Sequence, residues 1–147
     1  MMAEKARFFG DEDSRALILQ AASPKEMKAL GRGIRGFDEE RWRSVRERVV
    51  LKGSLLKFGQ NPKLLSFLLS TAGVLVEASP YDNIWGIGET LCMRALCRRL
   101  HVMPLAGLLE SDALAAQPDT WAGDNLLGFI LTQARDMLRE QAAAAPP

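Results

Sequence analysis

The chain has 147 residues, 48% hydrophobic and 25% charged, which is typical of a water-soluble globular protein of about one domain. Its 19 basic and 18 acidic residues give a net charge of +1, so no overall field marks a nucleic-acid or membrane binder. Two cysteines are too few for a secreted disulfide framework, and no apolar run reaches the roughly 18 residues of a membrane span. With no targeting peptide visible at the N-terminus, we expect a protein of the reducing cytoplasm.

Helix caps punctuate the first part of the chain. The stretch "MMAEKARFF" predicts a short helix that stops at Gly10, and "DSRALILQAA" predicts a second helix after the acidic residues 11–13. The stretch "SPKE", residues 23–26, is a capping box with proline at the first helical position. It predicts a third helix that Gly31 or Gly33 ends.

The remaining helices are separated by one irregular segment. Asp38 can cap a long helix over "EERWRSVRERVVLKGSLLKF", and Asn61 can cap an apolar helix over "KLLSFLLSTA". The extended piece "VLVEA" leads into "VEASPYDNIWGIG", residues 76–88, and "DNLLGFILTQARDMLRE" predicts a C-terminal helix. We therefore expect a mainly α-helical fold, one multihelical domain over residues 1–140 and a disordered tail over residues 141–147.

Residues 89–118 are the hardest part of the sequence to interpret. Cys92, Cys97 and His101 match no zinc spacing and lack a fourth ligand, so ordinary helix packing is the preferred interpretation and no metal is expected. The segment is both apolar and basic. An amphipathic helix over residues 91–109 that binds a partner protein is therefore the alternative.

The irregular segment concentrates the groups that could carry chemistry. The chain has a single histidine, so acid or base work falls to carboxylates. Glu77 and Asp82 flank a Ser-Pro turn, Trp85 follows, and Gly86 and Gly88 permit close approach of a ligand. An aromatic ring beside two carboxylates suits hydrolysis at a sugar carbon through an oxocarbenium-like transition state. The structural alternative makes Asp82 a turn cap, Trp85 a core residue and Glu77 a salt-bridge partner, and spacing alone favours it.

A series of blocks in the chain resembles the NADAR family, the YbiA-like proteins that include N-glycosidases of riboflavin biosynthesis intermediates. The blocks are "MMAEKARFFGD", "LGRGIRGFD", "RWRSVRERVV", "LLKFGQNPKLLSFLLSTAGVLVEASPYDNIWGIG" and "WAGDNLLGFIL" followed by "AR". They cover most of residues 1–88 and 119–140. The resemblance implies a compact, mainly α-helical fold and cleavage of an N-glycosidic bond. The substrate would be a phosphoribosyl intermediate of the riboflavin pathway or an ADP-ribose-type adduct, and no cofactor is expected.

Carried over by position, Glu77 and Asp82 lie in the family's pocket segment, and as its two carboxylates they are the expected catalytic residues. The implied substrate-binding residues are Lys5, Arg32, Lys57, Gln60, Asn61, Trp85, Gly86, Gly88 and Asn125. If the resemblance carries function, Lys5, Arg32, Asp82, Trp85 and Asn125 should point into one pocket. Each carry-over has a plain alternative: the lysines are solvated, Arg32 binds helix-end carbonyls, and Asn61 and Asn125 are helix caps.

Two departures from the family pattern leave three functional classes open. Family members carry an upstream Ser-x-Glu-His motif whose glutamate is the favoured catalytic group, and this chain begins after it. The connection from Gly88 to Trp121 is also longer, which makes residues 89–118 an insertion. The chain is expected to be an N-glycosidase weakened by loss of that glutamate, an inactive nucleotide or ADP-ribose-binding module, or a helical interaction domain.

The expected partner is a small ribosyl nucleotide-like substrate. Neither a membrane nor bulk nucleic acid is expected as a partner, while ADP-ribosylated nucleic acid stays open as a substrate. The oligomeric state is left open.

Overall fold

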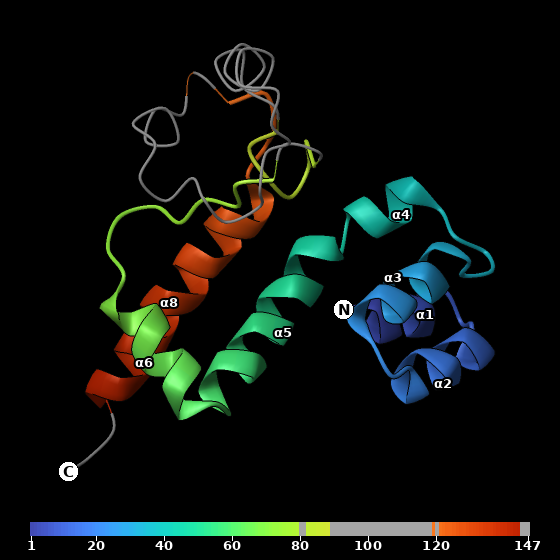
Figure 1. The fold of residues 1–147 in the computed structure, drawn as a ribbon, viewed down its shortest axis with the longest axis horizontal. Helices are drawn as coiled ribbons and strands as arrows, with labels where there is room; N and C mark the ends of the chain where they lie inside the picture. Colours follow the sequence, from blue (N-terminus) through green and yellow to red (C-terminus); the bar gives the residue numbers. More distant parts are fainter. Residues whose placement is uncertain (80–81, 89–118, 120, 145–147) are drawn as a thin grey trace, which may run out of the picture. The chain divides into compact units, whose positions relative to one another are not determined.

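The computed structural model describes residues 1–79, 82–88, 119 and 121–144 (Figure 1). Within these ranges the chain forms seven α-helices and no β-strand, so the prediction of a mainly α-helical fold is confirmed. None of these helices combines the length and hydropathy needed to cross a lipid bilayer. The helices are α1 (Met2–Phe8), α2 (Glu12–Gln20), α3 (Pro24–Arg32), α4 (Glu39–Arg43), α5 (Arg46–Gly59), α6 (Pro62–Ser70) and α8 (Leu126–Ala144).

The chain divides into two compact units, Met1–Gly53 and Ser54–Pro147. In the first unit α1, α2 and α3 pack against one another. Their core is formed by the buried side chains of Ala6, Ile18 and Ile34, with partly buried hydrophobic residues around it. The burial of these apolar side chains is what stabilises three helices that are each too short to be stable alone.

Helix boundaries in this unit follow the predicted capping residues. Gly10 adopts φ +74° directly after α1, a left-handed conformation that favours glycine. Asp11 caps α2 by accepting a hydrogen bond from a first-turn amide. Ser23 caps α3 by accepting one from the Glu26 amide, and α3 ends before Gly33. The first three predicted helices are therefore confirmed.

The predicted single helix after Asp38 is wrong, because the chain is divided there into α4 and α5. Asp38 does cap α4, since its carboxylate accepts a hydrogen bond from the Arg41 amide at 2.7 Å. The Ser44 hydroxyl then donates to the Arg41 carbonyl oxygen at 2.8 Å, and the Val45 amide donates to the Trp42 carbonyl oxygen at 3.1 Å. A hydroxyl that bonds the backbone, together with a tightened i→i+3 turn, interrupts the α-helix.

A buried carboxylate fastens the loop after α3 to the start of α2. Asp11 is 2% exposed, and it accepts hydrogen bonds from the Arg35 amide at 2.9 Å and from the Arg35 guanidinium at 2.9 and 3.2 Å. Hydrogen bonding by Arg35 and then by Ser14 holds the pKa of Asp11 well below its ordinary value. The ionised form of Asp11 therefore stabilises this unit.

We expect the Asp11→Asn variant to lose stability at neutral pH and to lose less on acidification than the wild type. A carboxyl group with a depressed pKa stabilises the fold above its unfolded pKa of about 4, and this contribution disappears as the pH falls further. Urea unfolding at neutral pH and near pH 3 measures this, and the difference between the two proteins should narrow at low pH. Asp13→Asn, which changes an exposed partner of Arg35, is the matched control. A difference that is the same at both pH values contradicts the assignment.

In the second unit α6 packs against α8. Leu68 on α6 and Ile130, Ala134 and Leu138 on α8 are buried, so one face of the predicted C-terminal helix is apolar and packed. Helix α8 continues through Ala144, so the first residues of the predicted tail are helical. The interpretations that involve Cys92, Cys97 and His101, a helix over residues 91–109, or residues 145–147 fall outside the described residues.

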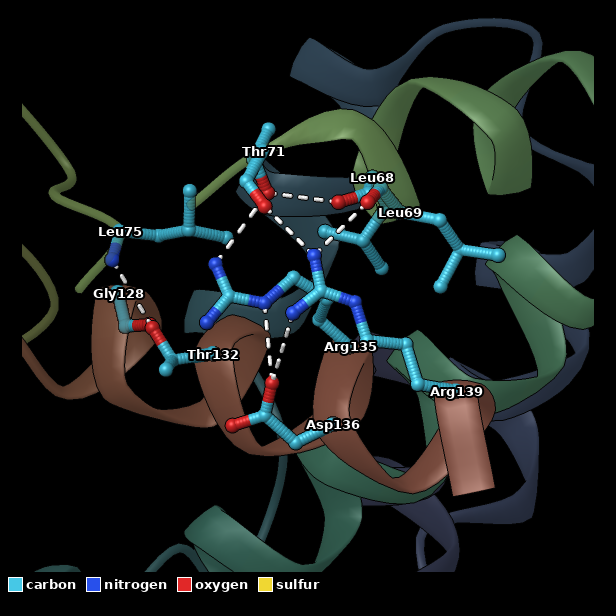
Figure 2. Close-up of polar contacts among 9 residues, drawn as sticks. All are labelled: Leu68, Leu69, Thr71, Leu75, Gly128, Thr132, Arg135, Asp136 and Arg139. Carbon is cyan, nitrogen blue, oxygen red and sulfur yellow. Dashed lines mark hydrogen bonds and ion pairs between the residues drawn. The ribbon is translucent and has the colours of Figure 1, made fainter. Parts of the chain in front are cut away.

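Polar side chains of α8 hold the chain that follows α6 (Figure 2). The Arg139 guanidinium donates to the Thr71 carbonyl oxygen at 2.7 Å, and the buried Arg135 donates to the Thr71 hydroxyl at 3.3 Å. Nearer the start of α8, the Leu75 amide donates to the Thr132 hydroxyl oxygen at 2.9 Å. Residues 71–75 are thus fastened along α8 before the irregular segment begins.

Two glycine-to-alanine substitutions should change stability in opposite directions. A Cβ at Gly53, inside α5, would meet nothing within 4 Å, so Gly53→Ala should stabilise the protein by about 0.5–1 kcal/mol. A Cβ at Gly128, inside α8, would overlap the Leu75 carbonyl oxygen and the Asn125 amide, so Gly128→Ala should destabilise it by about 1–3 kcal/mol. Urea unfolding of both variants checks this, and a neutral Gly128→Ala would contradict the close approach.

Candidate functional site

Asp82 organises the second half of the irregular segment. Its Oδ1 accepts hydrogen bonds from the Ile84 amide at 3.1 Å and the Trp85 amide at 2.8 Å, and its carbonyl oxygen accepts one from the Gly86 amide at 3.1 Å. This is the turn cap of the structural alternative. The other oxygen, Oδ2, takes no hydrogen bond from the part of the chain that the structure describes. A half-buried carboxylate that is held by one oxygen keeps the second oxygen available for chemistry.

Glu77 is held through its main chain. Its amide donates to Asn125 Oδ1 at 3.0 Å, and its carbonyl oxygen accepts a hydrogen bond from the Ile87 amide at 3.0 Å. The side chain is half-buried, and the salt bridge expected in the structural alternative is absent among the described residues. The Ile87 bond ties Glu77 to the turn that carries Asp82, so both carboxylates stand on one connected piece of backbone.

The irregular segment caps the N-terminus of α8. Amides of residues 124–127 donate to the carbonyl oxygens of residues 83–86 at 2.9–3.1 Å. The first amides of a helix have no partner within the helix, and here the segment provides those partners. The amide end of α8 is therefore occupied by the chain itself, and it fixes the position of the turn that carries Asp82 and Trp85.

The glycines of the segment lie against the protein's own backbone. A Cβ at Gly86 would come within 2.8 Å of the Glu77 carbonyl oxygen. Gly88 has φ +66°, and a Cβ there would lie 3.2 Å from Gly123. Both positions therefore need glycine for packing within the chain, and a close approach of ligand to either glycine stays a prediction.

Trp85 and Asn125 differ in their exposure. Trp85 is half-buried, so part of its side chain faces solvent, as a stacking surface requires. Asn125 is 0% exposed, and its side chain bonds the main chain on both sides of residue 76. Asn125 thus binds the irregular segment from the protein interior and has no exposed surface.

Lys5 lies in the first unit, among aromatic rings. Its Nζ donates to the Gly31 carbonyl oxygen at 3.1 Å and stands 3.9 Å from the centre of the Phe37 ring and 5.9 Å from that of Trp42. Burial lowers the pKa of Lys5, and the Glu39 carboxylate offsets part of that effect. Trp42 is 7% exposed and belongs to the core.

Arg32 directly follows Gly31, whose carbonyl oxygen Lys5 binds, so both predicted cationic residues belong to the first unit. Arg32 is exposed at the end of α3 and makes no hydrogen bond or ion pair with the described residues. The alternative in which Arg32 binds helix-end carbonyls is therefore not observed. The pair is suited to an anionic group such as a phosphate.

Lys57, Gln60 and Asn61 form a separate group at the corner between α5 and α6, where all three are exposed. Asn61 precedes α6 without a side-chain cap bond; its Nδ2 donates to the Lys57 carbonyl oxygen. A Cβ at the neighbouring Gly59 would lie 3.9 Å from Leu138, near the C-terminal part of α8. The irregular segment meets the other end of α8, roughly 18 Å away along the axis at 1.5 Å per residue. Within the second unit these three residues are therefore not brought to Glu77 and Asp82.

Sequence reasoning missed several residues that hold the site. Thr132 and Arg135 fasten the chain before the segment, and Phe37 covers the Lys5 ammonium. A signal was present for Gly128, because a glycine inside a run of good helix formers often marks a close backbone approach. Nothing in the spacing indicated the other three residues.

Comparison with known proteins identifies the family of the chain. The NADAR domain family profile matches residues 1–139. The chain belongs to the NADAR family. It is 36% identical to an N-glycosidase of Acanthamoeba polyphaga mimivirus over 137 residues, which are 92% of this chain and 69% of that protein. It is 36% identical to N-glycosidase YbiA of Escherichia coli (strain K12) over 85 residues, 57% of this chain and 53% of YbiA.

A third relative is the chloroplastic riboflavin biosynthesis protein PYRR of Arabidopsis thaliana, 40% identical over 93 residues, which are 56% of this chain and 16% of that protein. This NADAR domain thus spans only part of the length of each relative. The resemblance noted in the sequence is confirmed, and the activity, substrate and partners of this NADAR domain are treated as proposals. No group of three or more metal-ligating side chains occurs among its described residues.

Proposed function

We propose that this NADAR domain is an N-glycosidase-type hydrolase that acts on a ribosyl nucleotide-like substrate. The observation that carries the proposal is the irregular segment, where two half-buried carboxylates, Glu77 and Asp82, and the partly exposed Trp85 stand on backbone that α8 holds in place. Two relatives with N-glycosidase in their names support the reaction type.

In the proposed reaction the bond between the ribosyl anomeric carbon and the base nitrogen breaks, the bonding electrons leave with the base, and the base nitrogen takes a proton from the protonated carboxyl group of Glu77. The other carboxylate stabilises the oxocarbenium-like transition state and takes a proton from the attacking water, whose oxygen bonds to the anomeric carbon. Asp82 is assigned this role because its Oδ2, which accepts no hydrogen bond from the described residues, belongs to a carboxylate that the turn already orients. Glu77 is assigned to protonating the departing base, and Trp85 is assigned to stacking on the base or sugar.

Lys5 and Arg32 are proposed to bind the phosphate groups of the substrate. Their support is local: the partly buried Lys5 ammonium lies against the Phe37 ring, and Arg32, next in sequence to the residue that Lys5 binds, is exposed and has no ionic partner among the described residues. Substrate contacts at Gly86, Gly88 and the α5–α6 corner stay predictions. The alternative of an inactive ADP-ribose-binding module shares these contacts and differs only in turnover.

A panel of substrates tests the proposal. The protein is incubated with the two phosphoribosyl intermediates of riboflavin biosynthesis and with ADP-ribosyl compounds. Chromatography then measures released ribose 5-phosphate or ADP-ribose. Release from one class above the enzyme-free rate is expected. Saturable binding without release would favour the binding module, and neither binding nor release would reject both.

A further inference from the structure

We propose that Asn125 is a positioning residue that sets the main chain of Glu77, and that it does not contact the substrate. This inference rests on the proposed function, because it assigns Asn125 a role through Glu77. Asn125 Oδ1 accepts a hydrogen bond from the Glu77 amide at 3.0 Å, and Asn125 Nδ2 donates to the Leu75 carbonyl oxygen at 3.0 Å. The two bonds hold residues 75–77 from one side chain.

Burial excludes a direct contact in this arrangement. Asn125 is 0% exposed and is among the largest fully buried side chains of the described residues. Its amide already binds the protein with both its oxygen and its nitrogen. A buried amide that is bonded at both ends is costly to rearrange, since a lost partner leaves an unsatisfied polar group.

The backbone around Asn125 is shaped for this role. Asn125 has φ 50°, the only positive φ of a non-glycine residue in the described chain, and asparagine tolerates this conformation better than most residues. Its own amide donates to the Gly86 carbonyl oxygen at 3.0 Å. Gly128, one turn into α8, leaves space for the Leu75 carbonyl oxygen to approach the Asn125 amide. The main chain of Asn125 therefore binds Gly86, and its side chain binds Leu75 and Glu77, so one residue connects residues 75–77 to Gly86.

Thr132 provides a second anchor, because it binds Leu75, which lies two residues before Glu77. The Leu75 amide donates to Thr132 Oγ1 at 2.9 Å, and the Thr132 hydroxyl donates to the Gly128 carbonyl oxygen at 2.8 Å (Figure 2). Leu75 is thus bound at both its amide and its carbonyl group. A catalytic carboxylate that moves by about 1 Å can lose ~10²-fold in rate, so these anchors bear on kcat.

The test separates a positioning role from substrate contact by kcat and KM. Asn125→Gly keeps the positive φ and removes the amide, and we expect kcat to fall by about 10²-fold with KM changed less than about threefold. Thr132→Val removes the second anchor with little change of shape, and a smaller loss in kcat with unchanged KM is expected. Thr132→Ser keeps the hydroxyl and should retain the wild-type kcat.

Ile130→Val on the same helix is the matched control, because it lowers stability without touching a bond to the segment. Its kcat should equal that of the wild type. A rise in KM with unchanged kcat in Asn125→Gly would overturn the inference in favour of a substrate contact. If Asn125→Gly does not fold, an undiminished kcat in Thr132→Val overturns the inference. An inactive wild type would instead reject the proposed function.

Discussion

Replacing Asp82 by asparagine is expected to lower kcat by about 10²–10⁴-fold while the helical fold is retained. Asparagine keeps the oxygen that accepts hydrogen bonds from the Ile84 and Trp85 amides, so the turn should persist. Only the negative charge and the proton-accepting capacity of Oδ2 are lost. Steady-state kinetics measures the effect on the substrate that the wild type cleaves, and circular dichroism checks the fold.

Two further variants separate chemistry from structure at this position. Asp82→Ala also removes the turn cap, so it should lose stability as well as activity. Asp124→Asn removes an exposed carboxylate from the same unit and should leave kcat unchanged. Undiminished turnover in Asp82→Asn would show that the chemistry lies on other residues.

The second large effect is expected for Glu77→Gln, with kcat lowered by about 10²-fold or more. The substitution keeps both main-chain hydrogen bonds of residue 77 and a side chain of the same shape, so the bonds to Asn125 and Ile87 remain. What disappears is a carboxyl group that has no ionic partner among the described residues. Steady-state kinetics on the substrate that the wild type cleaves measures the loss.

Glu140→Gln on α8 provides the control for Glu77→Gln, because it neutralises an exposed glutamate at the other end of the helix. Its kcat should match that of the wild type. If Glu77→Gln also shows the wild-type kcat, Glu77 has a structural role only, and Asp82 is the one proposed catalytic carboxylate that remains.

Local patterns predicted the helices well, because their boundaries depend on residues close in sequence. Ser23 and Asp38 cap the helices that follow them, and Gly10 ends the first helix through its own backbone conformation. The break between α4 and α5 was missed for the opposite reason. The sequence gives no sign that Ser44 ends a helix, because the break depends on the hydrogen bond from its hydroxyl to the carbonyl oxygen of Arg41.

The candidate site was predicted in part, since its support comes from residues distant in sequence. The irregular segment was recognised from its turn residues, and the turn-cap alternative for Asp82 is confirmed, because its Oδ1 accepts a hydrogen bond from the Trp85 amide. The role of Asn125 depends on bonds across 48 and 50 positions of sequence, which no local pattern contains. The convergence of Lys5 and Arg32 with Asp82 stays a prediction, because the two compact units are described separately.

The most direct measurement is the time course of sugar release by the wild type and by the double variant Asp82→Asn/Glu77→Gln, under identical conditions and with substrate in excess. Both chains keep the backbone bonds of the irregular segment, so they differ in two carboxyl groups only. The account predicts release of ribose 5-phosphate or ADP-ribose by the wild type and none above the enzyme-free rate by the double variant. Equal release by both proteins would contradict the assignment of N-glycosidic bond cleavage to this segment.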